Sequence, residues 1–190
     1  MESAMSPLPR LLRFLAILSF VFVGATFDAR AAESVGKVTN VVNQAQIGTR
    51  TAVVGAPVYM SQRLRTGANA RLQVTFRDGS VLSLGENANV AIDRFVYNPK
   101  KSTGELALNA ARGAVRFTGG KIEKMKKKKV TVTTPQAAMA VRGTDFWAGP
   151  IDGQYGVLLL KGRVAVRHRH GAATLSRPGY GIDIPRRRKR

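Results

Sequence analysis

The sequence contains no cysteine and only two histidines among its 190 residues. Without cysteine, the chain can form no disulfide and offers no thiolate for catalysis or metal binding. The histidines, His168 and His170, lie two positions apart and are flanked by Arg167 and Arg169. A metal ion needs a third ligand, and arginines repel a cation, so an exposed basic strand is the simpler interpretation. We expect no metal site.

Acidic residues are also scarce, with 11 Asp and Glu against 31 Lys and Arg, which gives a net charge of +20. The patterns place Asp78, Glu86 and Asp93 at turns or strand ends, and the sequence shows no pair of carboxylates suited to acid–base catalysis. A glycine-rich phosphate loop and a Gly-x-Ser-x-Gly motif are absent as well. We therefore predict a protein that is not an enzyme and that needs no cofactor. Its charge predicts attraction to anionic surfaces, weakened by salt.

The one long apolar run lies at the start of the chain. Phe14–Val23 is apolar apart from Ser19, follows Arg10 and Arg13, and precedes the small-x-small sequence Ala29–Ala31. This pattern is typical of a secretory signal peptide, and the run is shorter than the roughly 20 residues that a membrane span needs. We expect residues 1–31 to form a signal helix that is removed on export to the periplasm. An uncleaved anchor in the inner membrane is the alternative.

No stretch after residue 33 shows sustained helical periodicity, whereas strand patterns recur between turn residues. In the segment 71–84, a three-residue loop at Arg77–Gly79 places Val74 opposite Leu82 and Leu72 opposite Leu84. This register gathers the apolar residues on one face and puts Gly79 at the left-handed position of the loop. The sequence predicts an all-β fold, a single domain built of hairpins.

Two further segments have similar patterns. "ALNAARGAVRF" and "LLLKGRVAVRH" both consist of an apolar strand, a basic residue with glycine, and a valine-containing strand. We interpret the second as a hairpin over 155–167 with a turn at Lys161-Gly162. A repeated strand–turn–strand unit would produce either a β-solenoid-like roll or a sandwich, and the sequence does not choose between them.

Two charge runs occur in the sequence, one before the strand pattern at 130–134 and one at the end of the chain. Lys126, Lys127, Lys128 and Lys129 form one run, and Arg186, Arg187 and Arg188 belong to the other. We expect the segment 121–129 to be a mobile, solvated run and residues 181–190 to form a basic tail. The β domain is then expected to cover residues 32–180.

The stretch "TTPQAAMAVRGTDF", residues 133–146, is unusual because a short apolar strand ends in Arg-Gly-Thr-Asp. Pro135 prevents a helix, and Gly143 allows a sharp turn or a close approach of a neighbouring strand. Arg142 can satisfy unpaired carbonyls, while Thr144 and Asp145 can bind backbone N–H groups. The motif has two interpretations, a structural corner or a ligand site at Arg142 and Asp145.

Together with "LQVTFRDGSVLSLGENANVAI" and "VLLLKGRVAV", this stretch resembles the FecR domain, and the resemblance covers roughly residues 35–175. It implies a non-catalytic exported module that acts in envelope signalling or assembly by contacting an envelope protein. Binding would involve Arg142, Asp145 and Trp147, with Gly79, Pro135, Gly143, Thr144 and Gly162 as structural positions. FecR-type regulators carry a cytoplasmic segment that precedes a membrane span, and only residues 1–9 precede the first basic residue here. Direct control of a sigma factor is therefore not expected.

A second hypothesis rests on the charge runs alone. A polyanion-binding envelope protein could hold lipid headgroups, lipopolysaccharide or a wall polymer through Lys126–Lys129 and Arg186–Arg188. Nucleic acid is not an expected partner, because no aromatic stacking platform lies among the basic residues. The sequence does not predict an oligomeric state.

Overall fold

The computed structural model describes residues 33–185, and within that range the chain is built of β-strands with no α-helix. The prediction of an all-β fold is confirmed. No helix in the described range is long and apolar enough to span a membrane. One short 3-10 helix, η1, occupies Lys121–Lys124. The strands are β1 (Gly36–Val42), β2 (Ala45–Ile47), β3 (Arg50–Thr51), β4 (Pro57–Val58), β5 (Arg63–Thr66), β6 (Arg71–Phe76), β7 (Val81–Leu84), β8 (Asn89–Asn98), β9 (Thr103–Arg112), β10 (Val115–Thr118), β11 (Lys127–Thr133), β12 (Ala137–Ile151), β13 (Gln154–His168), β14 (Gly171–Leu175) and β15 (Gly181–Ile184).

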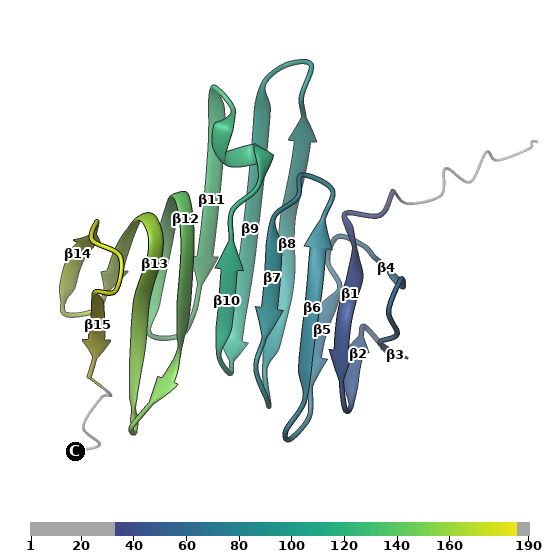
Figure 1. Ribbon diagram of the computed structural model, residues 1–190, viewed down its shortest axis with the longest axis horizontal. Coiled ribbons are helices and arrows are strands. Elements are labelled where there is room, and N and C mark those ends of the chain that lie inside the picture. Colours follow the sequence, from purple (N-terminus) through teal and green to yellow (C-terminus); the bar gives the residue numbers. More distant parts are fainter. Residues whose placement is uncertain (1–32, 186–190) are drawn as a thin grey trace, which may run out of the picture. The chain divides into compact units, whose positions relative to one another are not determined.

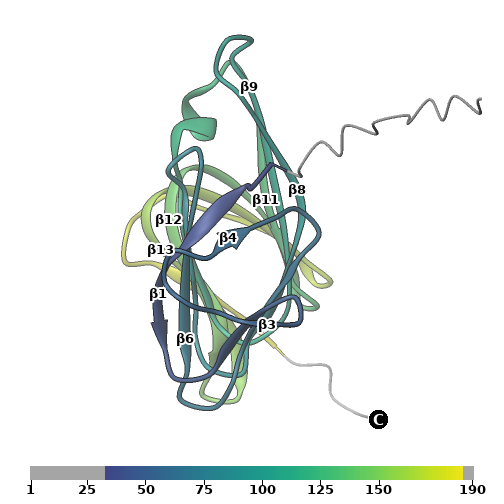
Figure 2. The ribbon, with the colours of Figure 1, turned by 90° about the vertical axis from the view of Figure 1, so that its right-hand side faces the viewer.

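These strands form one curled mixed sheet (Figure 1). Its main path runs β3-β2-β5-β8-β9-β11-β12-β10-β7-β6-β1-β4, and β13 joins through β12 and carries β14 and β15. The pairing of β9 with β11 is parallel, and the other strand pairs in the described range are antiparallel. In Figures 1 and 2, β10, β7, β6 and β1 lie across from β11, β9, β8 and β5. The curled sheet thus has two facing layers.

The long hairpin of β12 and β13 joins the two layers at one end. The first half of β12 pairs with β11, with Thr131 opposite Ala140. The second half pairs with β10, with Phe117 opposite Phe146. Since β11 and β10 belong to opposite layers, β12 turns a corner between its two halves. The register with β13 shifts between Arg142 and Asp145, which places the corner at the Arg-Gly-Thr-Asp motif.

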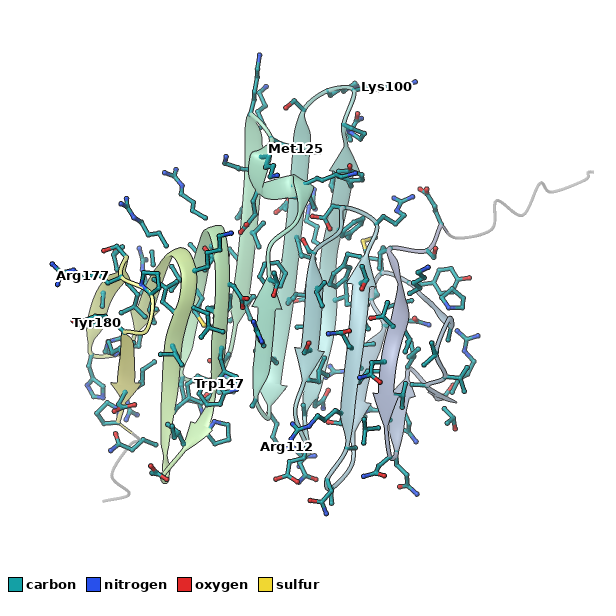
Figure 3. The ribbon with its side chains drawn as sticks, in the orientation of Figure 1. Lys100, Arg112, Met125, Trp147, Arg177 and Tyr180 are labelled. Carbon is teal, nitrogen blue, oxygen red and sulfur yellow. The ribbon has the colours of Figure 1, made fainter. Side chains whose placement is uncertain are left out.

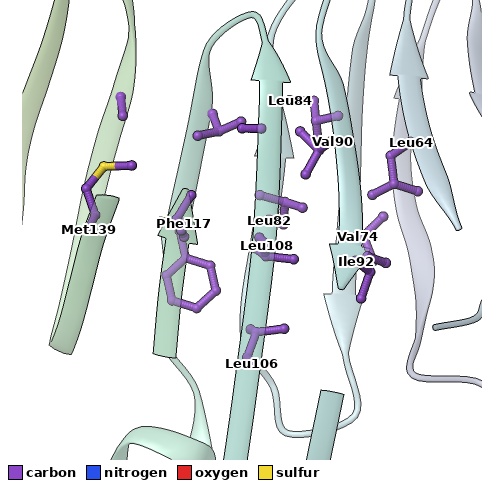
Figure 4. Close-up of a cluster of buried hydrophobic side chains, with 14 of the residues drawn as sticks. Leu64, Val74, Leu82, Leu84, Val90, Ile92, Leu106, Leu108, Phe117 and Met139 are labelled. Atoms are coloured by element: carbon purple, nitrogen blue, oxygen red, sulfur yellow. The ribbon is translucent and has the colours of Figure 1, made fainter. Parts of the chain in front are cut away.

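The core fills the space between the layers. Strand residues from both sides are fully buried, among them Leu64, Leu82, Leu106, Phe117 and Phe146 (the first four are labelled in Figure 4). The phenyl rings of Phe117 and Phe146 lie 6.1 Å apart across the β10–β12 pair. Apolar alternation on each strand therefore builds the core, as expected for half-buried strands.

The hairpin predicted from the segment 71–84 is confirmed in its register. Leu72 lies opposite Leu84 and Val74 opposite Leu82, and all four side chains are buried. The Phe76 amide donates to the Ser80 carbonyl at 2.8 Å, and Gly79 has φ +82°. The loop is therefore the three-residue type that the apolar pattern required.

The predicted hairpin turn at Lys161-Gly162 is wrong. Residues 154–168 form one strand, β13, that stays paired with β12 on both sides of Gly162. Gly162 has φ +81°, so its left-handed conformation forms an irregularity opposite the corner in β12 instead of a reversal. The other copy of the proposed repeat is not a hairpin either, because β9 pairs with β8 and β11 while β10 pairs with β7 and β12. The Arg112-Gly113 turn instead carries the chain from one layer to the other.

The expectation of a mobile lysine run is also wrong in part. Lys127, Lys128 and Lys129 are the first residues of β11 and pair in parallel with Thr103, Gly104 and Glu105 of β9. A run of charged side chains is compatible with an exposed strand as well as with a solvated coil. At the other end, β15 pairs with β13, so the sheet extends into the segment 181–190. The predicted signal peptide and Arg186–Arg188 lie outside the described residues.

Candidate binding groove at the β12–β13 corner

The corner depends on close contact between two backbones. Gly143 has φ +61°, and a Cβ atom on Gly162 would lie 2.1 Å from the Gly143 carbonyl oxygen. Thr144 is buried and connects both strands, because its Oγ1 accepts from the Arg142 amide at 3.0 Å and donates to the Arg163 carbonyl at 2.6 Å. Thr144, and not the Arg142 guanidinium, thus satisfies the backbone groups that the irregularity leaves unpaired.

Two buried carboxylates support the corner from inside the domain. Glu123 of η1 is 8% exposed, and its Oε2 accepts from the Thr144 amide at 3.0 Å. Asp78 of the β6–β7 loop is fully buried and accepts from the Ser80 amide and hydroxyl and from the Ile122 amide. Burial raises the pKa of Glu123 above its ordinary value, and the Asp78 charge raises it further, while the Thr144 amide opposes both effects.

Asp145, a predicted binding residue, is held by an ion pair. Its carboxylate accepts both guanidinium hydrogen bonds of Arg116 on the neighbouring strand β10, at 2.9 and 2.7 Å. This bidentate geometry occupies both carboxylate oxygens. The structure therefore separates Asp145 from Arg142, whose side chain lies on the exposed face before the corner.

Three connected depressions follow the exposed face of β11, β12 and β13 on the Arg142 side of the corner. The first has a volume of about 630 Å³ and lies between the Thr134-Pro135 turn and Arg167–Arg169. The second, about 480 Å³, lies over Ala138, Ala140 and Ala165. The third, about 280 Å³, ends at Arg142 and Arg163. The first and second share Ala138 and Arg167, and the second and third share Ala140 and Ala165. We call this continuous surface the basic groove.

The lining of the basic groove carries charge of one sign. Its cations are Lys128, Lys129, Arg142, Arg163, Arg167 and Arg169, and none of its lining residues is acidic. Ala138, Ala140 and Ala165 are exposed because they stand between buried neighbours on their strands. A floor of small side chains with basic ends can hold an extended anionic ligand.

Other predicted binding residues lie away from the basic groove. Trp147 is half-buried on the second half of β12, past the corner (Figure 3). Its ring covers Gly149 and Gly156, where an added Cβ would meet ring atoms at 2.9 and 3.6 Å. Lys126 precedes β11, and its amide donates to Ser102 Oγ. Of the predicted residues in the described range, Lys128, Lys129, Arg142 and Pro135 line the groove, whereas Lys126, Lys127, Asp145 and Trp147 do not.

Residues 33–185 contain no cluster of three side chains suited to a metal ion. The rings of His168 and His170 lie 6.1 Å apart, and Arg169 donates to His170 Nε2 at 2.8 Å. Tyr155 is buried behind the Thr-Pro turn, and burial raises its pKa to about 12 despite a contact with Thr134. The Tyr155 phenol therefore stays neutral in the physiological range.

A family model described as FecR protein matches residues 62–165, which is more than half of the sequence. The chain belongs to the FecR family. The matched range includes both sides of the corner at Gly143 and Gly162, and it ends before Arg167 and β14. Membership of the FecR family supports a signalling-related role for this module.

Two solved structures from Parabacteroides distasonis match part of this chain. Both are described as crystal structures of a "putative anti-sigma factor", at 1.65 and 2.50 Å resolution. Each is 20% identical with a TM-score of 0.47, and the match covers 64% of this chain and 58% of the solved chain. This FecR chain thus spans little more than half of the solved chains. No curated protein matches its sequence.

Sequence reasoning missed two sets of residues in this FecR domain. Arg163 and Arg167 line the basic groove, and their signal is present in "RVAVRH", where basic residues and alanine alternate with buried valines. The predicted hairpin already made this segment a strand, but only the long-range pairing of β13 with β12 brings Arg163 opposite Arg142. Glu123 was missed because it stands among lysines, and only the fold shows that it turns inward to Thr144.

Proposed function

We propose that this FecR-family chain is a non-catalytic binding module, exported from the cytoplasm, that serves envelope signalling or assembly by contacting a protein partner. The observation that carries the proposal is the basic groove, an exposed, charged depression built on paired strands. Such a rigid platform is suited to recognition. The two buried acids support a non-catalytic role, because both accept hydrogen bonds from backbone amides of the scaffold.

Site-specific photocrosslinking tests the proposed partner. A photoreactive residue replaces Ala140 on the groove floor, and in a matched variant it replaces Lys100 at the exposed β8–β9 tip (Figure 3). We expect a discrete crosslinked protein from Ala140 in intact envelopes and none from Lys100. Identical adduct patterns at both positions, or no adduct from the groove and from other exposed positions, would contradict a binding module.

Export has a separate test. If residues 1–31 are a cleaved signal, N-terminal sequencing of the protein recovered from the periplasmic fraction should begin at Ala32. Recovery of an uncleaved chain in the inner-membrane fraction would support the anchored alternative.

A further inference from the structure

The basic groove contains a charge arrangement that the fold does not require. Arg142 and Arg163 lie directly opposite each other on β12 and β13, and both are exposed. Like charges in this position repel and destabilise a strand pair. The corner itself uses only their backbone groups, through Thr144. The repulsion between the two opposed guanidinium groups therefore lowers the stability of the free protein. An anionic ligand bound between them would offset this repulsion.

Three arginines outside the groove form ion pairs within the described residues. Arg116 pairs with Asp145, Arg94 with Glu105, and Arg77 with Glu33. Within residues 33–185, the one acid paired with a groove cation is Glu105, whose Oε1 lies 3.8 Å from Lys129 Nζ. In residues 33–185, therefore, no acid forms an ion pair with Arg142, Arg163, Arg167 or Arg169, and the groove keeps its positive charge.

The groove cations form two groups separated by neutral floor. Arg142 and Arg163, with Lys129 beside them, mark one end, and Arg167 and Arg169 mark the other. Arg163 and Arg167 are four positions apart on β13, which corresponds to about 13 Å at roughly 3.3 Å per residue. Between them the floor consists of small side chains, namely Ala138, Ala140, Ala165, Thr131 and Thr174.

We propose that the basic groove binds an extended acidic segment of a protein partner, lying along β12 and β13. Carboxylates four residues apart in the segment contact the two basic groups, and small apolar side chains between them rest on the alanine floor. An extended chain has the same rise per residue as the strands beneath it, so the spacings match. Arginine suits this role because its planar guanidinium binds a carboxylate bidentately. This inference rests on the proposed function and specifies the chemistry of the partner.

The observations favour a polypeptide over other anionic partners. No Phe, Tyr or Trp lines the groove, so it lacks the stacking surface that single-stranded nucleic acid uses. A flat bilayer surface would contact the protruding arginine heads without filling the alanine floor. A second copy of this chain carries the same excess of positive charge and would be repelled.

Fluorescence anisotropy with two labelled peptides tests the inference. The first peptide contains Glu-Ala-Val-Ala-Glu, and the second contains the same residues reordered as Ala-Val-Ala-Glu-Glu. We expect the purified protein to bind the first several-fold more tightly than the second. The double variant R142Q/R163Q should weaken binding of the first peptide about tenfold, because two charge-assisted contacts are lost.

The matched control K100Q/K101Q removes the same charge from the exposed β8–β9 tip and should leave peptide affinity unchanged. Equal affinity for the two peptides, or equal loss in both double variants, would show general charge attraction and overturn the proposal. Vesicles of phosphatidylglycerol provide a third arm. If R142Q/R163Q lowers vesicle binding while peptide binding is unaffected, the groove is a membrane site and the proposal is wrong.

Crosslinking separates this inference from the proposed function. If a partner is crosslinked from Ala140 and R142Q/R163Q leaves its yield unchanged, the module binds a protein but the acidic-segment inference fails. If no exposed position captures a partner, the proposed function fails as well. Loss of the adduct in R142Q/R163Q, with retention in K100Q/K101Q, supports both.

Discussion

Gly143 and Gly162 face each other at the corner, yet the structure gives them different tolerances to substitution. Both have positive φ, at +61° and +81°, but a Cβ on Gly143 meets nothing within 4 Å. A Cβ on Gly162 would collide with the Gly143 carbonyl oxygen. The residue singled out by the sequence motif is thus the less constrained of the two.

We therefore predict that G143A costs about 1–2 kcal/mol of unfolding free energy, from backbone strain alone. G162A should cost about 1–3 kcal/mol more, because the backbones must separate. Urea denaturation of the two variants measures the difference. Equal costs would show that the close approach of the strands at the corner is not maintained in solution.

The buried carboxylate of Glu123 should make stability depend on pH. Its pKa is raised in the folded protein, so the folded state holds this proton more tightly than the unfolded chain. The contribution of Glu123 to stability is present below its unfolded pKa of about 4.5 and is lost as pH rises through the raised pKa of the folded protein. In the E123Q variant the side chain is uncharged at every pH, so this loss of stability does not occur.

The stability of E123Q relative to the original protein should accordingly increase between pH 4 and pH 7. Urea denaturation at pH 4, 5.5 and 7 checks this, with D152N at the exposed β12–β13 tip as the control. A difference that stays constant with pH would show that Glu123 is not desolvated.

Strands whose alternation is regular could be predicted from the sequence, and strands with irregularities could not. The β6–β7 hairpin followed from Leu72, Val74, Leu82 and Leu84, because one register alone buries them together. In β12 and β13 the buried positions change parity at the corner, from Val141 to Thr144 and from Leu159 to Val164. A glycine with positive φ serves a turn or a bulge equally well, and only long-range pairing with β12 decides between them.

The candidate site could likewise be predicted only where a local pattern marked its residues. Arg142 could be singled out because it stands in an unusual motif, and Lys128 and Lys129 because they stand in a charge run. That these residues share a face with Arg163 and Arg167 depends on the order β11-β12-β13, which no local pattern encodes.

Apposition of Arg142 and Arg163 on β12 and β13 should cost stability in the free protein. We predict that R163Q raises the unfolding free energy by about 0.2–1 kcal/mol, because a like-charge pair is removed from opposed strand positions. The gain should shrink between 20 and 300 mM sodium chloride, since salt screens exposed charges. Urea denaturation at both concentrations measures this gain, and R71Q, which removes an exposed charge from β6 far from the pair, is the control. A loss of stability in R163Q would show that the guanidinium has a structural role.

The domain as a whole is a sheet with an interior and edges, and its local stability should follow that arrangement. Strands β7, β10 and β12 have partners on both sides and bury their apolar residues between the layers. Strands β3, β4 and β14 each have one partner and lie at the edges. Local opening costs least where few buried contacts and few backbone pairs are broken.

Hydrogen exchange followed by mass spectrometry should therefore show the slowest amides in β7, β10 and β12 and the fastest in β3, β4 and β14. The middle of β13 provides the sharpest comparison. If residues 157–166 form one strand, peptides covering them should exchange more slowly than the exposed Asp152-Gly153 tip. A hairpin turn at Lys161-Gly162 would instead give rapid exchange there, comparable to the tip. That result would also contradict the corner between β12 and β13, because Gly162 could no longer lie against Gly143. Arg163 and Arg167, which mark the two basic groups of the groove, would then not lie on one continuous strand paired with β12.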